Sequence, residues 1–408
     1  MLFKKEIIKN FLNFGVIDFI GLLVPVLIMP ILTRTLGADA YGIYLLIFSI
    51  LFFGHTIIDY GTQYTSVREV ANNKQDFDLV KKVFLETQSI RVIFSLVYCL
   101  ICICYAAAFL AEDVYRLILY AAPLYLVGYA LIPTWYFQAQ SNMGLITKVS
   151  FLIKLVHVLV VVLFVREQTD LFLTTMSMGV PMFIGGIVLL IVCSKSEKLD
   201  VRITLNVIPR VKSGVHVFIG LLAPNLYNSI PTIFLGTSFP PDQFAKFAIA
   251  SRLCQVVVTL QNVLSKALYP VLARLQGSKV KGMLQANTLI SIPPLAVISL
   301  FGEELLGFLL GPEFAKSNEY LVILTVGVFF IGLANAVSQG YFLPKGLDAL
   351  YKNISLRVSL LSGLVTLFLV SEYGLFGGAL SITIARFLFF ADFSFTYYFK
   401  LMPKHSIK

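Results

Sequence analysis

The chain has 408 residues, of which 58% are hydrophobic and 13% charged, and its mean hydropathy is +0.85. An ordinary soluble domain is about a quarter charged and just under half apolar, so this composition excludes a soluble globular protein. Lys and Arg number 32 and Asp and Glu 22, which gives a net charge of +10. A basic balance in so apolar a chain points to orientation in a membrane rather than to nucleic acid.

Apolar runs long enough to cross a bilayer recur along the whole sequence. A hydrocarbon core of about 30 Å requires roughly 20 apolar residues per helix, and the runs are continuously apolar rather than alternating as in β-barrel strands. We therefore predict an all-α polytopic membrane protein with about twelve transmembrane helices. The expected spans are 11–32, 40–62, 89–110, 115–137, 145–165, 171–193, 214–236, 243–265, 285–308, 319–342, 353–371 and 375–399.

The basic residues divide unequally between alternate connections of this topology. With the N-terminus in the cytoplasm, 23 Lys and Arg fall on the cytoplasmic side, five on the opposite side and four within the spans. Cytoplasmic connections of membrane proteins carry an excess of Lys and Arg. An even number of spans with both termini cytoplasmic is therefore the expected arrangement.

An internal duplication relates the first and seventh spans. Residues 19–37 and 218–236 are identical at 11 of 19 aligned positions. Six spans separate the two copies, so both copies cross the membrane in the same direction. We expect two parallel-related six-helix lobes, residues 1–200 and 201–408, around a central cavity.

Prolines interrupt the same two spans, at Pro25 and Pro30 in the first and at Pro224 and Pro231 in the seventh. Proline removes a helical hydrogen bond and bends the helix. Paired interrupted helices in the two halves of a transporter commonly mark the substrate site and the moving elements. The four prolines are therefore candidate hinges, and static kinks are the alternative.

Charged residues within the spans are costly and usually have a task. An interior that is slightly basic suits an anionic substrate, because Arg can hold phosphate oxygens with two parallel hydrogen bonds. The candidate substrate-binding residues are Arg252, Arg386, Lys154 and Arg357. The candidates for ion coupling are Asp18, Asp59 and Asp392. For each of these charges, snorkelling to the headgroups or a structural ion pair is the alternative.

Several strings resemble those of polysaccharide flippases of the Wzx type. Pro30-Ile31-Leu32-Thr33-Arg34-Thr35-Leu36-Gly37 followed by Tyr41-Gly42 is similar to the end of that family's first span. The stretch from Asp59-Tyr60-Gly61 to Arg68-Glu69-Val70-Ala71 resembles its second-span exit, and Pro133-Thr134-Trp135-Tyr136-Phe137-Gln138-Ala139 resembles its fourth-span exit. Within these strings Arg34 and Arg68 are further candidates for gating.

This resemblance implies a flippase of the multidrug/oligosaccharidyl-lipid/polysaccharide exporter superfamily. Such a protein moves an undecaprenyl-diphosphate-linked oligosaccharide across the bacterial inner membrane by alternating access, for O-antigen or capsular polysaccharide assembly. Membrane lipid, a polysaccharide polymerase and a chain-length regulator are the partners that the resemblance suggests. A polysaccharide polymerase and a cation-coupled drug exporter of the same superfamily are the alternatives. The longest external connection, 303–318, contains no His and argues against an enzyme.

The sequence suggests no cofactor, metal or nucleic-acid partner. It contains no Gly-rich phosphate loop followed by Lys, so ATP is not expected to drive transport directly. Three of the five cysteines lie in the expected third span, where we interpret them as small packing residues.

Overall fold

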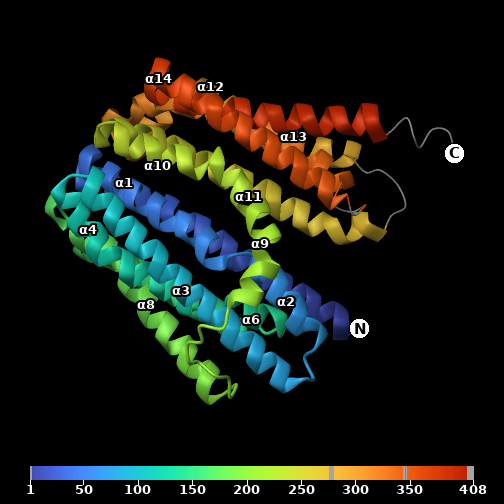
Figure 1. The fold of residues 1–408 in the computed structure, drawn as a ribbon. Coiled ribbons are helices and arrows are strands. Elements are labelled where there is room, and N and C mark those ends of the chain that lie inside the picture. Colours follow the sequence, from blue (N-terminus) through green and yellow to red (C-terminus); the bar gives the residue numbers. More distant parts are fainter. Residues whose placement is uncertain (1, 275–279, 343–344, 346, 402–408) are drawn as a thin grey trace. The chain divides into compact units, whose positions relative to one another are not determined.

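The computed structural model describes residues 2–274, 280–342, 345 and 347–401; it describes only the backbone of 2–20, 22–23, 262–274, 339, 348 and 400–401. The described chain is helical and divides into two compact units, Met1–Leu222 and Ala223–Lys408. Figure 1 shows the helices in chain order. The boundary between the units falls within the expected seventh span, whereas the duplication suggested a boundary at residue 200.

The first unit follows the apolar runs closely. Its elements are α1 (Leu2–Asp59), α2 (Thr62–Asn72), α3 (Phe77–Phe109), α4 (Glu112–Ala122), a π-helical turn (Pro123–Val127), α5 (Gly128–Leu131), α6 (Thr134–Ala139), α7 (Gly144–Phe164), a 3₁₀ turn (Gln168–Asp170), α8 (Leu171–Lys195) and α9 (Ile208–Leu222). α3 begins twelve residues before the expected third span, because Asp76 caps it by accepting a hydrogen bond of 3.0 Å from the Leu79 amide.

α1 consists of two helices joined at a kink, in the region where the sequence predicts two spans. Its 58 residues would extend about 87 Å at about 1.5 Å per residue, far more than a bilayer core of about 30 Å. Gly37 breaks the helical path with φ 72° and ψ 176°, a conformation open essentially only to glycine. The chain stays helical at Pro25 and Pro30, so the turn between the first two expected spans is made by Gly37 and not by a proline.

The second unit contains a 3₁₀ turn (Ala223–Leu226), α10 (Ser229–Ser238), α11 (Pro241–Arg274), α12 (Val280–Leu310), a 3₁₀ segment (Pro312–Ser317), α13 (Asn318–Val337), a π-helical turn (Ser338–Phe342), α14 (Asp348–Phe395) and a final π-helical segment (Thr396–Leu401). α14, like α1, is interrupted by a glycine. Gly374, with φ 58° and ψ −135°, joins two helices that correspond to the last two expected spans. Pro224 lies in the 3₁₀ turn and Pro231 in the first turn of α10, so the second copy of the duplicated string is interrupted where the first is continuous.

Within the described residues, eight helical segments are long and apolar enough to cross a membrane, or nine if the bent pair Ile208–Leu226 and Ser229–Ser238 is one span. The protein is therefore an all-helical, multi-pass membrane protein. This number is lower than twelve partly because Val24–Asn72 and Ala349–Phe399 are each taken as one segment of 49 and 51 residues. Each of these two segments contains a turning glycine.

Candidate functional site

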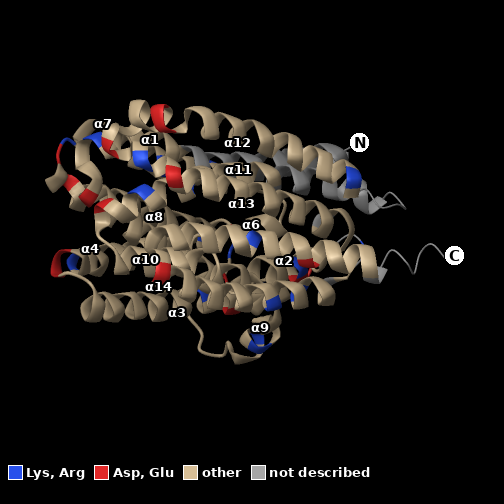
Figure 2. Ribbon diagram, turned by 90° about the horizontal axis from the view of Figure 1, so that it is seen from above, with Lys and Arg blue, Asp and Glu red and all other residues tan. Residues whose placement is uncertain are grey.

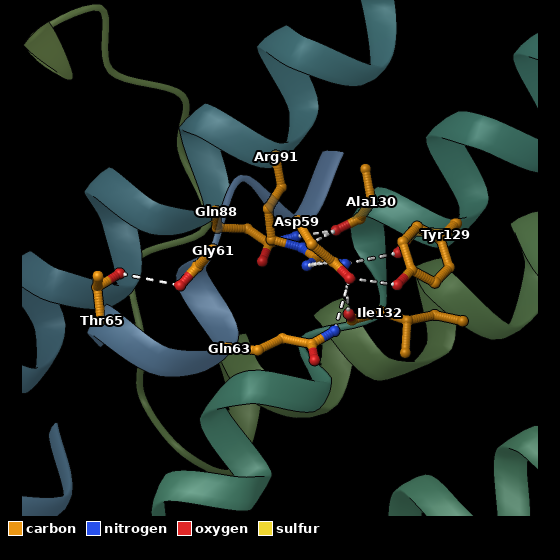
Figure 3. Close-up of polar contacts among 9 residues, drawn as sticks. All are labelled: Asp59, Gly61, Gln63, Thr65, Gln88, Arg91, Tyr129, Ala130 and Ile132. Carbon is orange, nitrogen blue, oxygen red and sulfur yellow. Dashed lines mark hydrogen bonds and ion pairs between the residues drawn. The ribbon is translucent and has the colours of Figure 1, made fainter. Parts of the chain in front are cut away.

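The end of α1 carries an ion pair buried among helices of the first unit. Asp59, the last residue of α1, pairs with Arg91 of α3, whose side chain is 2% exposed, against 13% for Asp59 (Figure 3). The Tyr129 hydroxyl donates to Asp59 Oδ2 at 2.8 Å, and Gln63 Nε2 donates to the same oxygen at 2.6 Å. Asp59 therefore joins α1, α2, α3 and α5.

Arg91 also binds the carbonyl groups released where α5 ends. α5 stops at Leu131, Pro133 has no amide hydrogen, and the Thr134 amide donates to the Ile132 carbonyl at 2.9 Å. Arg91 Nε donates to the Ala130 carbonyl at 3.3 Å, and Arg91 Nη2 donates to the Tyr129 carbonyl at 3.1 Å. A cation at a helix C-terminus is also favoured by the helix dipole. Arg91 thus stabilises both the carboxylate and the break before α6.

An aromatic stack covers this ion pair. The centre of the His55 ring lies 3.6 Å from that of the Tyr129 ring, with 10° between the ring planes, and the Tyr125 ring also stacks on His55 at 5.5 Å. The Arg91 guanidinium lies 5.3 Å from the Tyr129 ring centre. Tyr129 therefore contacts both members of the pair and the stacked imidazole.

Sequence reasoning identified Asp59 and missed Arg91. The charge count places Arg91 among the 23 basic residues of the cytoplasmic side, although it falls within the expected span 89–110. The sequence contains a signal that could have indicated this site, because the polar residues Gln88 and Arg91 stand one helical turn apart at the start of an apolar run. Both donate to the Ala130 carbonyl, Gln88 Nε2 at 2.7 Å.

A second charged cluster fastens α9 to α2 and α3. Arg210 Nη1 lies 2.9 Å from Glu69 Oε2, and its Nε lies 2.8 Å from Glu86 Oε2. Next to it, the Tyr60 hydroxyl donates to the Val211 carbonyl at 3.2 Å, and the Tyr60 ring stacks on Phe218 at 4.5 Å. The start of α9 therefore lies against the end of α1, although 151 residues separate Tyr60 and Val211 in sequence.

In the second unit the structure pairs two predicted residues with each other. Arg357 and Asp392 lie on the two halves of α14 and form a forked ion pair, with Nε–Oδ2 at 3.0 Å and Nη2–Oδ1 at 2.6 Å. Thr396 Oγ1 is 3.5 Å from Asp392 Oδ1. The pair lines a cavity of about 370 Å³, together with Val358, Leu361, Leu388, Ala391, Phe395 and Thr396.

Arg386 is buried inside the same unit. It is 6% exposed, and its Nη1 donates to the Leu324 carbonyl of α13 at 3.3 Å. Within the described part of the chain, no carboxylate lies at ion-pair distance from Arg386. Cys254 of α11 contacts Thr325 at 3.5 Å, so α11, α13 and α14 meet at this level, and Arg252 lies on α11 two residues before Cys254. The guanidinium nitrogens of Arg252 are shielded from solvent.

The other predicted residues are dispersed over the first unit. Lys154 of α7 lies against α1, since a Cβ at Gly21 would come within 3.1 Å of Lys154 Nζ. Arg34 and Arg68 are exposed. Asp18 lies on α1 outside the residues whose side chains are described.

The described residues contain no group of three or more His, Cys, Asp or Glu side chains that could hold a metal ion. All five cysteines are free, and four are buried as packing residues.

Comparisons with known proteins give both a family and a fold. A model of the family described as polysaccharide biosynthesis protein matches residues 7–276. A Shigella dysenteriae protein described as an O-antigen transporter is 25% identical over 394 residues, covering 94% of this chain and 97% of that protein. An Escherichia coli K12 protein with the same description is 25% identical over 378 residues, covering 90% of each chain.

Among solved structures, the lipid II flippase MurJ in its inward closed conformation matches with a TM-score of 0.71 and 14% identity, over 95% of this chain and 87% of that one. An inward-facing multidrug resistance MATE family transporter of the MOP superfamily matches with a TM-score of 0.69 and 13% identity, over 95% and 97%. At these identities the two likenesses establish the fold alone.

Proposed function

Because the chain belongs to the polysaccharide biosynthesis protein family and has a MOP superfamily fold, we propose that it is a flippase for a lipid-linked oligosaccharide. The substrate is an undecaprenyl-diphosphate-linked repeat unit of an O-antigen or capsular polysaccharide. The protein moves this unit across the bacterial inner membrane by alternating access, with both termini in the cytoplasm. Relatives described as O-antigen transporters, alike over 94% and 90% of the chain, support this assignment.

The observation that carries the proposal is the buried Arg386. It stands twelve residues after Gly374, which places it about 18 Å along the second half of α14 at about 1.5 Å per residue. This is near mid-depth in a hydrocarbon core of about 30 Å, where an uncompensated Arg is costly. An anionic substrate supplies the missing charge when the site opens. Arg252, near the same level of the unit, is the second basic residue proposed for this role.

A cation-coupled drug exporter shares the fold but fits these charges less well, because a cationic drug requires carboxylates facing the transport path. In the second unit Asp392 is already paired with Arg357, and the buried Arg386 has the opposite sign. A polymerase is also less favoured, because the relatives are described as transporters. Asp18 and Asp59 remain proposed sites of ion coupling.

The proposal is tested in a strain that lacks the gene. Lipid-linked repeat units should accumulate and polymer should disappear from the cell surface, and the wild-type gene should restore it. We expect Arg386→Ala to restore less than a tenth of the polymer and Arg386→Lys more than Arg386→Ala. Arg116→Ala, at an exposed arginine of α4, is the matched control and should restore all of it.

Two outcomes would contradict different parts of this proposal. Normal surface polymer in the deleted strain would contradict the flippase function. Full restoration by Arg386→Ala, at wild-type protein levels in the membrane, would contradict only the role of Arg386.

A further inference from the structure

The Arg357–Asp392 pair lies far along α14 from the turn at Gly374. Arg357 stands 17 residues before Gly374 and Asp392 stands 18 residues after it. The ion pair therefore lies about 26 Å from the turn, at about 1.5 Å per residue. Because a hydrocarbon core is about 30 Å thick, a turn at one surface places the pair near the headgroups of the other. In the proposed orientation this is the cytoplasmic leaflet.

One edge of the guanidinium remains available at this depth. Asp392 engages Nε and Nη2, and among the described residues Nη1 makes no hydrogen bond. The Arg357 side chain is 63% exposed, whereas that of Asp392 is 17% exposed. The carboxylate therefore orients the guanidinium, and the Nη1 edge faces outward. Two N–H groups on a planar fork match the oxygens of a phosphate.

The cavity beside this pair is mostly apolar. Five of its eight lining residues are apolar, namely Val358, Leu361, Leu388, Ala391 and Phe395, and the polar residues Arg357, Asp392 and Thr396 complete it. Its volume of about 370 Å³ is within the range of small-molecule sites, about 300–1,000 Å³. Between Arg357 and Gly374, the first half of α14 carries three leucines that are more than 60% exposed: Leu360, Leu364 and Leu367. An apolar path thus leads from the cavity along the surface of the helix.

We propose that this cavity binds a phosphate-bearing lipid, with the phosphate on the Nη1 edge of Arg357 and the first part of the hydrocarbon chain against Leu361, Leu388 and Phe395. The occupant fitting both features is the polyprenyl diphosphate end of the substrate, before it enters the transport path. This inference rests on the proposed function, and the site is separate from the buried Arg386. An ion pair that only joins the two halves of α14 would not use the cavity or the free edge.

Binding is measured on the purified full chain by native mass spectrometry with undecaprenyl diphosphate. Undecaprenol and inorganic pyrophosphate, which each lack one half of the ligand, should bind at least tenfold more weakly. Arg357→Ala should weaken undecaprenyl diphosphate binding at least tenfold, and Ala391→Phe, which fills the cavity, should weaken it with Arg357 intact. Asp392→Asn, which removes a negative charge, should bind at least as tightly as wild type.

Arg116 and Glu112 provide the matched control, since they form an exposed ion pair on α4, with side chains 65% and 73% exposed. Arg116→Ala should leave binding unchanged. The site is refuted if Arg357→Ala binds like wild type, or if Asp392→Asn loses as much binding as Arg357→Ala while both variants melt at the wild-type temperature. Oligosaccharide transport is assayed separately in proteoliposomes. Failure of transport with Arg357-dependent lipid binding intact would overturn the function and leave the site standing.

Discussion

At the scale of single residues, Arg91 explains how this apolar unit tolerates a charge. Removing a guanidinium from water costs several kcal/mol unless an opposite charge and hydrogen bonds replace the solvent. Arg91 has both: the Asp59 carboxylate and the carbonyl groups of Tyr129, Ala130 and Ile132. The carbonyl groups are available only because α5 ends before Pro133. The charge and the helix break therefore stabilise each other.

We predict that Arg91→Ala destabilises the first unit by about 3 kcal/mol, the scale of breaking a buried ion pair. The loss leaves the partly buried Asp59 without its counter-charge and removes the Arg91 donors from the end of α5, where Gln88 still donates to the Ala130 carbonyl. Thermal unfolding of the detergent-solubilised protein measures the effect. Arg116→Ala breaks an exposed pair instead and should cost less than about 1 kcal/mol. Equal melting temperatures for the two variants would contradict the buried role of Arg91.

At the scale of elements, two glycines turn helices that would otherwise be too long. Gly37 and Gly374 both have positive φ, outside the regions open to other residues. Their surroundings differ. Nothing lies within 4 Å of a Cβ built at Gly37, whereas a Cβ at Gly374 would lie 3.2 Å from the Phe239 ring. Gly37 is therefore required for its backbone conformation alone.

Gly374→Ala should destabilise the second unit by about 1–3 kcal/mol, because alanine is strained at this φ and ψ. Gly363 lies in the same helix α14, in open space, and provides a control of opposite sign. Gly363→Ala should stabilise by about 0.5–1 kcal/mol, because alanine has the higher helix propensity. Thermal unfolding of both variants tests this pair. A Gly374→Ala protein as stable as wild type would show that the turn does not need glycine.

The attachment of α9 depends on Arg210, which reaches Glu69 and Glu86 on two different helices. We predict that Arg210→Ala increases amide hydrogen exchange in residues 208–214 about tenfold, which corresponds to about 1.4 kcal/mol of local stability. Exchange in α8 should not change. Arg210→Lys should give an intermediate increase, since an ammonium group lacks the planar fork. Uniformly faster exchange through the first unit would contradict a local attachment.

The positions of the two helix turns could be predicted from the sequence. The expected connections 33–39 and 372–374 contain the two turning glycines, because the apolar runs end there. The site was harder to predict. Arg91 and Arg357 both stand near the ends of apolar runs, where charge is normally attributed to the headgroups. Their partners, Asp59 and Asp392, are 32 and 35 residues away in sequence, so only the folded structure reveals the pairs.

At the scale of the whole molecule, the family indicated by the exit strings is confirmed by the match over residues 7–276. The number of crossings is still a prediction from charge and length. Figure 2 shows Lys and Arg on α9, whose first residues, 208–213, are expected on the cytoplasmic side, and Asp and Glu at the start of α4, which is expected outside. The same rule places Gly37 and Gly374 outside and the two charged clusters of the first unit inside.

Cysteine labelling distinguishes twelve crossings from fewer. In a background without native cysteines, Asp39→Cys and Glu372→Cys lie beside the two turning glycines at exposed positions. A membrane-impermeant maleimide should label both in intact spheroplasts, because each long helix reaches the outer surface at its turn. Asn73→Cys and Lys352→Cys, exposed at the opposite ends of these segments, should react only after permeabilisation. If Asp39→Cys and Glu372→Cys resisted labelling until the membrane was opened, the 49- and 51-residue segments would not each cross twice, and the even topology inferred from the basic residues would fail.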